Sequence, residues 1–194
     1  LTPEGVLLRK RAEEILEMVQ KTESEFSSMG NTVAGDVHIG GGETEAMRQI
    51  ASLIREIQED YPETRFHIFS GNAEDVTERL DKGILDFGIL IQPVDIMKYN
   101  SIRLPDKVVW GVIMRKNTPL AAKRSITRRD LSGLPLICSR QAIRHLPQKN
   151  EYSEWFEEAV REMNIVATYN LIYNAALMVE EGVGYAIALD RLIN

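Results

Sequence analysis

Three consecutive glycines followed by an acidic and a hydroxyl residue, Gly40-Gly41-Gly42-Glu43-Thr44, separate two patterned segments of the chain. Alternating Val37 and Ile39 before the glycines predict a strand, and a 3.6-residue period from about Glu43 to Asp60 predicts a helix. Bare backbone between a strand end and a helix amino terminus is a common place for a small anionic or polar ligand. The segment therefore predicts that something small is bound here, without identifying it.

These glycines do not complete a nucleotide fingerprint, because the chain has neither Gly-x-Gly-x-x-Gly nor the Lys-Ser/Thr of a P-loop here. Enzymatic chemistry is also poorly supported. Cys138 would need a nearby base to act as a nucleophile, and His38, His67 and His145 are scattered without partner spacing. Cys138 is expected to be a buried structural thiol. The His and Cys residues lack metal-ligand spacing, so we expect no catalytic residue, metal or cofactor.

Composition bounds the class of protein. The chain has 194 residues, of which 44% are hydrophobic and 27% charged, as in an ordinary soluble globular protein. The net charge of -6 argues against a generally basic nucleic-acid surface. One cysteine excludes an internal disulfide, and neither a signal peptide nor a membrane-spanning apolar run is visible. A run of basic residues is expected to form a solvated face rather than to contact DNA. It consists of Arg115, Lys116, Lys123, Arg124, Arg128 and Arg129.

The first 29 residues predict one long helix over residues 2–29, with Thr2 as its N-cap and Pro3 at its first position. Apolar residues recur at spacings of four and three, which is a heptad seam with charged residues outside it. Such a helix favours a partner helix, and the alternative is that it packs on its own domain. The seam consists of Leu8, Ala12, Ile15, Val19, Thr22, Phe26 and Met29.

After Pro62, Phe66, Ile68 and Phe69 predict a second strand. Asn72-Ala73-Glu74-Asp75 is a capping box that predicts a short helix ending near Gly83. Residues 87–91 form an apolar run typical of a strand buried on both faces. Strand–helix–strand–helix–strand at this spacing predicts a parallel sheet with right-handed crossovers.

The rhythm changes after Pro93, and the rest of the chain predicts a second α/β lobe. One long strand is expected over residues 108–114, followed by a turn at residues 117–120. The later expected elements are a capping box at residues 127–130, strands at residues 134–138, 165–167 and 184–189, a helix from Ser153, and a helix from an Asn170 cap to Glu181 with Gly182 as its stop.

A series of short motifs, taken in order, resembles the landmarks of LysR-type transcriptional regulators. Leu1-Thr2-Pro3-Glu4-Gly5 resembles the opening of the family's linker helix, and residues 35–40 resemble the start of its regulatory domain. Each motif is weak alone, but their order and spacing are specific and cover essentially the whole chain. The others are Asp60-Tyr61-Pro62, Leu85-Asp86-Phe87-Gly88-Ile89, Thr118-Pro119-Leu120-Ala121 (where the family usually has His-Pro-Leu-Ala) and residues 182–189.

The resemblance implies an α/β fold with two lobes of the type 2 periplasmic-binding-protein kind, preceded by a long linker helix. The implied domains are a linker and dimerisation helix at residues 1–34, lobe I at residues 35–107 without its closing segment, and lobe II at residues 108–194. It implies a cytoplasmic homodimer or homotetramer that senses a small-molecule effector between the lobes. DNA would be bound only through a winged helix-turn-helix that this chain lacks, and no membrane is involved.

The resemblance also assigns candidate ligand-binding residues. Thr44 matches the family's Ser/Thr at the first helix terminus, where its hydroxyl and free N–H groups would hold an anion, or where it would merely cap the helix. Glu43 would repel an anion and favour an amine or a polyol, or would only stabilise the helix dipole. Arg140 would pair with a carboxylate or phosphate, or form a salt bridge. The full candidate set is Gly42, Glu43, Thr44, Asn72, Ile91, Gln92, Ser139, Arg140 and Asn170.

Two other functional classes share this architecture. A solute-binding protein of a transport system would have the same lobes, but the heptad helix argues against it. An enzyme such as a deaminase or lyase would need a pair of acid, base or nucleophile groups in the cleft, and the sequence offers no convincing pair.

Overall fold

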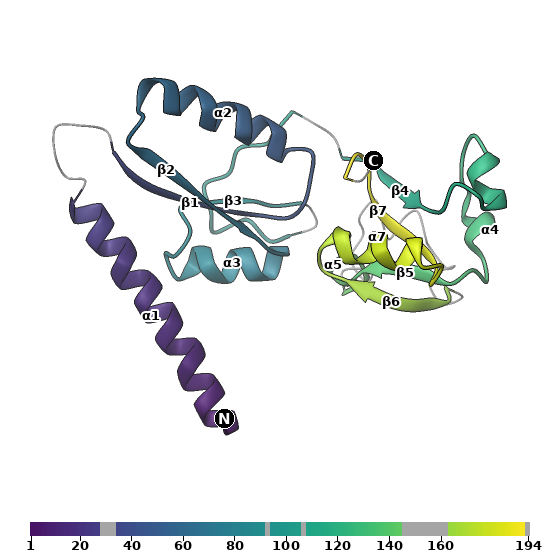
Figure 1. Cartoon of the computed structure of the whole chain (residues 1–194), viewed down its shortest axis with the longest axis horizontal. Helices are drawn as coiled ribbons and strands as arrows, with labels where there is room; N and C mark the ends of the chain where they lie inside the picture. Colours follow the sequence, from purple (N-terminus) through teal and green to yellow (C-terminus); the bar gives the residue numbers. More distant parts are fainter. Residues whose placement is uncertain (28–33, 92–93, 106–107, 145–162, 193–194) are drawn as a thin grey trace. The chain divides into compact units, whose positions relative to one another are not determined.

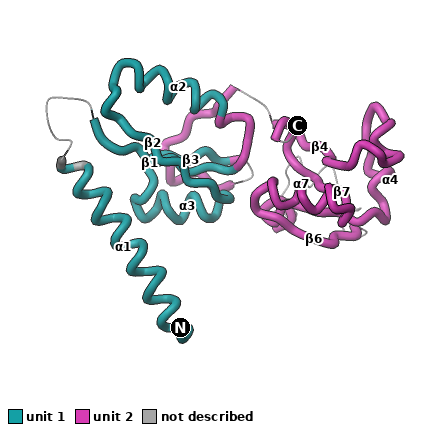
Figure 2. The backbone as a smooth tube through the Cα atoms, viewed as in Figure 1, with its two compact units in different colours: residues 1–42, 48–90 teal, residues 43–47, 91–194 magenta. Residues whose placement is uncertain are grey.

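The computed structural model describes residues 1–27, 34–91, 94–105, 108–144 and 163–192 (Figure 1). Within them the chain forms two compact units, coloured separately in Figure 2. Unit 1 comprises residues 1–42 and 48–90, and unit 2 comprises residues 43–47 and 91–194. The elements of unit 1 are α1 (Pro3–Ser27), β1 (Gly35–Gly41), α2 (Met47–Asp60, whose first residue falls in unit 2), β2 (Thr64–Ser70), α3 (Ala73–Asp81) and β3 (Phe87–Ile89).

Unit 1 is built on a parallel sheet with strand order β2-β1-β3, as predicted. Figure 1 shows α2 and α3 on opposite sides of this sheet. Val76 of α3 is fully buried, and Gly40 of β1 allows this close packing, because an added Cβ would lie 3.1 Å from Val76 Cγ1 and 2.4 Å from Leu85 Cδ1. The predicted capping box of α3 and the stop near its end are both confirmed, since Gly83 has a φ of 70°.

Unit 2 contains a mixed sheet of strand order β4-β7-β5-β6, in which β4 is antiparallel to β7 and the others are parallel. Its two faces bury alternate residues of β5: Leu136 and Cys138 on one face, and Ile137 with α7 on the other. The prediction of a buried Cys138 outside any disulfide is confirmed. The described elements are β4 (Trp110–Ile113), η1 (Pro119–Ala122), α4 (Arg128–Leu131), β5 (Leu136–Ser139), α5 (Arg140–Arg144), β6 (Ile165–Tyr169), α7 (Ile172–Glu180) and β7 (Tyr185–Leu189).

Two predicted strands are shorter than expected. β3 ends at Ile89, and Phe87 is 62% exposed instead of buried on both faces. The reason is that β3 lies at an edge of the described sheet. β4 spans only residues 110–113, because its ladder with the five-residue β7 runs only from Trp110↔Leu189 to Ile113↔Ala186. The predicted helix from Ser153 and the predicted stop at residues 30–32 lie outside the described residues.

The domain boundaries that were predicted after residues 34 and 107 stay predictions. Among the described helices, none combines the length and the apolar character needed to cross a membrane.

The imidazoles of His38 on β1 and His67 on β2 are stacked with ring centroids 4.7 Å apart. Partial burial, and then the neighbouring charge of His67, lower the pKa of His38. His38 therefore binds a proton more readily in the unfolded chain than in the folded one. The contribution of neutral His38 to the free energy of unfolding is complete above about pH 6.5 and is lost as pH falls through the folded-state pKa of His38. We expect the melting temperature to fall between about pH 7.5 and about pH 5.5, and to fall less in His38→Gln. Equal pH dependence of the two proteins in scanning calorimetry would contradict this.

Candidate functional site

In unit 1, the two predicted ligand residues lie where the parallel strands β1 and β2 end. Gly41 pairs with Ser70, and the N–H of Gly71 donates to the Gly41 carbonyl at 3.0 Å. Gly42 and Asn72 follow directly. The Asn72 side-chain oxygen accepts from the Asp75 N–H at 3.1 Å, and the Asp75 carboxylate accepts from the Asn72 N–H at 3.4 Å. Asn72 therefore caps α3, and its contact with a ligand stays a prediction.

The segment after the glycines differs from the sequence prediction. α2 begins at Met47, not at about Glu43, and its first turn contains no acidic residue. Thr44 is buried, its hydroxyl accepts from the Ala46 N–H at 3.4 Å, and its carbonyl accepts from the Met47 N–H at 3.1 Å. The prediction that Glu43 stabilises the dipole of this helix is therefore wrong. Thr44 holds the turn that leads into α2, and its contact with a ligand stays a prediction. A turn occupies the positions that the periodicity assigned to the helix.

Glu43 instead stabilises a helix that is far away in the sequence. Its Oε2 accepts a 2.6 Å hydrogen bond from the backbone N–H of Ile172, the first residue of α7. The helix starts two residues after Asn170, with Leu171 as its N-cap and no side-chain cap of its own. The prediction that Asn170 caps α7 is therefore wrong. Glu43 supplies the negative charge that an uncapped helix amino terminus favours.

The carboxyl ends of β5 and β6 bring further predicted residues together in unit 2. Ser139 pairs with Tyr169, and the Ser139 hydroxyl accepts from the Ala142 N–H at 3.4 Å. Arg140 is exposed at the start of α5, and Asn170 is exposed directly after β6. Tyr169 was not predicted from any sequence pattern, and its hydroxyl donates to the Ile187 carbonyl at 2.7 Å. Burial, and then the charges of Cys138 and Glu43, raise the pKa of Tyr169, so it remains a neutral donor.

Ile91 also belongs to unit 2, where its carbonyl accepts from Gln141 Nε2 at 3.4 Å. Gln92 lies outside the described residues. The structure thus gathers one set of predicted residues around the ends of β5 and β6 and the start of α7, while Gly42 and Asn72 lie in unit 1. The residues of that set are Glu43, Thr44, Ile91, Ser139, Arg140 and Asn170.

The sequence that carries these strand-end residues matches a known family model. Residues 30–194 match the LysR substrate binding domain. The chain belongs to this family. Among curated relatives, this LysR domain is 27% identical over 187 residues to the HTH-type transcriptional regulator YvbU of Bacillus subtilis, covering 96% of the chain and 61% of that protein. It is 26% identical over 137 residues to the regulator EstR of Acinetobacter baylyi, covering 71% and 46%.

Solved structures share the fold of this LysR domain. The effector binding domain of QuiR, solved in complex with shikimate, has a TM-score of 0.65 at 18% identity and covers 81% of this chain and 75% of that chain. The reduced form of OxyR has a TM-score of 0.61 at 18% identity, covering 83% and 73%. The two-lobe, periplasmic-binding-protein-like α/β fold implied by the sequence is therefore confirmed, and the transport alternative is not supported.

Proposed function

We propose that this LysR domain is the ligand-sensing part of a cytoplasmic transcriptional regulator and is not an enzyme. DNA would be bound by a winged helix-turn-helix elsewhere in the protein. The curated relatives named above are transcriptional regulators, and the chain spans 61% of the length of YvbU, which supports a further domain in the whole protein. The proposed effector site comprises the predicted ligand residues that unit 2 contains and describes, around Glu43 and the carboxyl ends of β5 and β6.

This proposal rests on one observation: the Ile172 N–H donates a hydrogen bond to the Glu43 carboxylate and holds that carboxylate in place. An anchored carboxylate beside buried Thr44 disfavours a second anion at the same place, because like charges repel in a partly desolvated site. We therefore propose an effector whose hydroxyl or amino groups face Glu43. If it also carries an acidic group, exposed Arg140 is the candidate partner.

A thermal-shift screen with polyols, amines and carboxylates, shikimate among them, tests this chemical class. We expect compounds with hydroxyl or amino groups to raise the melting temperature, and Glu43→Gln to remove the preference for amines. Stabilisation by simple carboxylates alone would contradict the role given to Glu43.

We expect Thr44→Val to weaken binding of a compound found in that screen while the domain stays folded. Loss of one neutral hydrogen bond of about 0.5–1.5 kcal/mol corresponds to a roughly threefold to tenfold weaker affinity in isothermal titration calorimetry. The matched control is Thr64→Val on β2, because the Thr64 hydroxyl is buried and has no hydrogen-bond partner among the described residues. Thr64→Val should leave the affinity unchanged and stability equal or higher. Unchanged affinity in Thr44→Val would remove Thr44 from the site.

We also propose that the protein acts as a homodimer or a larger homo-oligomer in which α1 pairs with α1 of a second copy. The seam predicted from the sequence supports this, because its described side chains are exposed on one face of α1. Met29 of the seam lies outside the described residues.

A further inference from the structure

The helix α1 packs on the rest of unit 1 through its polar face, not its apolar one. Its most covered residues include Glu14, Lys21 and Ser24, whereas Ile15 and Phe26 are 63% and 67% exposed. At 100° per residue, the covered residues centre almost opposite the heptad seam. We call the polar residues of α1 that contact the rest of unit 1 the polar interface. They are the exposed Lys10 and the more covered Glu14, Glu17, Lys21 and Ser24.

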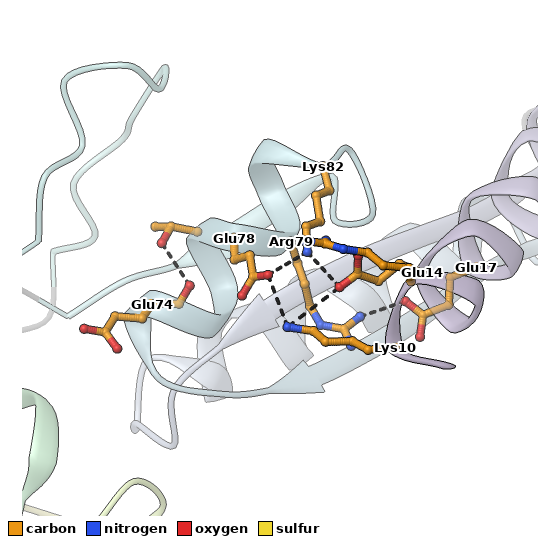
Figure 3. Close-up of polar contacts among 9 residues, drawn as sticks. Lys10, Glu14, Glu17, Glu74, Glu78, Arg79 and Lys82 are labelled. Atoms are coloured by element: carbon orange, nitrogen blue, oxygen red, sulfur yellow. Dashed lines mark hydrogen bonds and ion pairs between the residues drawn. The ribbon is translucent and has the colours of Figure 1, made fainter. Parts of the chain in front are cut away.

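The amino-terminal part of the polar interface faces α3 (Figure 3). Lys82 Nζ lies 2.8 Å from Glu14 Oε1 and 2.6 Å from Glu78 Oε1. One turn further along α1, Glu17 Oε2 lies 2.9 Å from Arg79 Nη1. Lys10 joins the network with its Nζ 3.5 Å from Glu78 Oε1. Each charged side chain in this contact between α1 and α3 therefore lies beside a side chain of opposite charge.

The second half of the polar interface holds the turn between α3 and β3. Lys21 is only 9% exposed, and its Nζ donates to the Gly83 carbonyl at 2.9 Å and to Asp86 Oδ1 at 2.6 Å. The other carboxylate oxygen of Asp86 accepts from the His38 N–H at 2.8 Å. Ser24 donates to the carboxylate of Asp36. A buried ammonium with two fixed acceptors makes this the firmest point of the contact.

The helix α3 therefore connects two places in unit 1. Its amino end is capped by Asn72, a candidate ligand residue, and its carboxyl end carries Arg79 and Lys82, which bind α1. We propose that the polar interface fixes the direction of α1, the dimerisation helix, and couples it to the amino end of α3. Lys21 is the point about which α1 would turn. This inference rests on the proposed function for its regulatory meaning, because the effector would act by favouring the attached or the released position of α1.

The ionisation of the network agrees with this role. Lys82, and then Arg11, lower the pKa of Glu14 to about 2, and Glu14 and Glu78 raise the pKa of Lys82. The pairs therefore remain charged at neutral pH. Because Glu78 and Glu17 are about half exposed, salt screens these pairs more than the buried Lys21 contact.

Spin labels on the full chain test the attachment directly. Cys138 is the sole cysteine and is buried, so Arg9→Cys on α1 and Glu59→Cys on α2 provide selective labelling sites. Both positions are exposed and belong to unit 1. Mixing labelled chains with an excess of unlabelled chain removes distances between two copies. Pulsed electron resonance then gives the distance distribution between α1 and α2.

We expect one narrow distance peak in the parent protein and the loss of most of its amplitude in Glu14→Lys, which places a lysine beside Lys82 and Lys10. The charge swap of Glu14→Lys with Lys82→Glu should restore the peak in part. The matched control is Glu13→Lys, which makes the same charge change on the same helix at an exposed position. The partner of Glu13 in the parent chain, Arg9, is already replaced by the label. Glu14→Lys with an unchanged peak, or Glu13→Lys with the same loss, would overturn the proposal. Circular dichroism verifies that each variant is folded.

Removing the α3 cap tests the coupling without any effector. Asn72→Ala should broaden the same distance peak, because a frayed amino end loosens the helix that holds α1. An unchanged peak would overturn the coupling. These measurements are independent of the effector screen. A screen without any stabilising compound would contradict the proposed function and leave the attachment of α1 in place. An unchanged distance peak in Glu14→Lys would contradict the attachment even if an effector binds.

Discussion

Ile15→Asp is expected to convert the dimer into a monomer at micromolar concentration. The described part of the seam projects from the face of α1 opposite the polar interface, and Leu8, Ile15 and Phe26 are 70%, 63% and 67% exposed. Burying one such side chain against a second copy stabilises association by about 1.5–3 kcal/mol. Apolar side chains repeated at this spacing on a helix that is already fixed by its other face are best satisfied by a second identical helix.

The aspartate acts twice in a dimer, because each copy contributes one carboxylate to the same apolar seam. Each copy loses the transfer free energy of the isoleucine, and the two buried carboxylates must also be desolvated. Several kcal/mol of lost association free energy corresponds to a dissociation constant weaker by about a thousandfold or more. Sedimentation velocity at increasing protein concentration measures this change.

The control is Gln20→Asp, which places the same side chain on an exposed position of α1 outside the seam. This variant should remain dimeric. A monomeric parent protein would contradict the dimer itself. A dimeric Ile15→Asp would show instead that the copies meet through the two units and not through α1.

Gly184→Ala is expected to destabilise unit 2, and to do so more than Gly111→Ala. A Cβ added at Gly184 would lie 2.4 Å from the carbonyl oxygen of Pro135 and 3.0 Å from its carbon. These are backbone atoms, and the same carbonyl accepts from the Tyr185 N–H at 2.9 Å where β5 and β7 begin to pair. No side-chain rotation relieves the contact, so the two strands must separate.

We estimate a loss of about 3 kcal/mol in the free energy of unfolding, at the upper end of overpacking effects. For a unit of this size, the loss lowers the melting temperature by about 10 °C or more. The control is Gly111→Ala on β4, where an added Cβ meets no atom of the described part of the chain within 4 Å. Gly111→Ala should melt close to the parent protein. If Gly184→Ala melts at the same temperature as Gly111→Ala, the predicted clash is relieved by the backbone at little cost.

Features set by neighbouring residues were predictable from the sequence. The helix over α1, the capping boxes at Asn72 and Thr127, and the glycine stops at Gly83 and Gly182 depend on side chains within a few residues of one another. The ordered motifs likewise identified the family that the match over residues 30–194 confirms. Periodicity could also define the apolar seam, because its members lie on one helix face whatever packs against the other.

Features set by distant partners could not be read in this way. The periodicity placed Glu43 at the start of α2, but its carboxylate binds the N–H of Ile172, 129 residues away. Asn170 was the local candidate for capping α7, yet the distant glutamate serves that helix end. The heptad pattern places Lys21 only among the charged residues outside the seam, and tertiary packing buries it against Asp86.

The sequence by itself determined the family, the succession of strands and helices, and the apolar seam, since all of these follow from residue patterns along the chain. Only the tertiary structure decided which charged side chains are buried, which helix end Glu43 serves and which face of α1 lies on unit 1. The physical reason is that a charge finds its partner by distance in space, and the spacing of residues along a chain does not encode that distance.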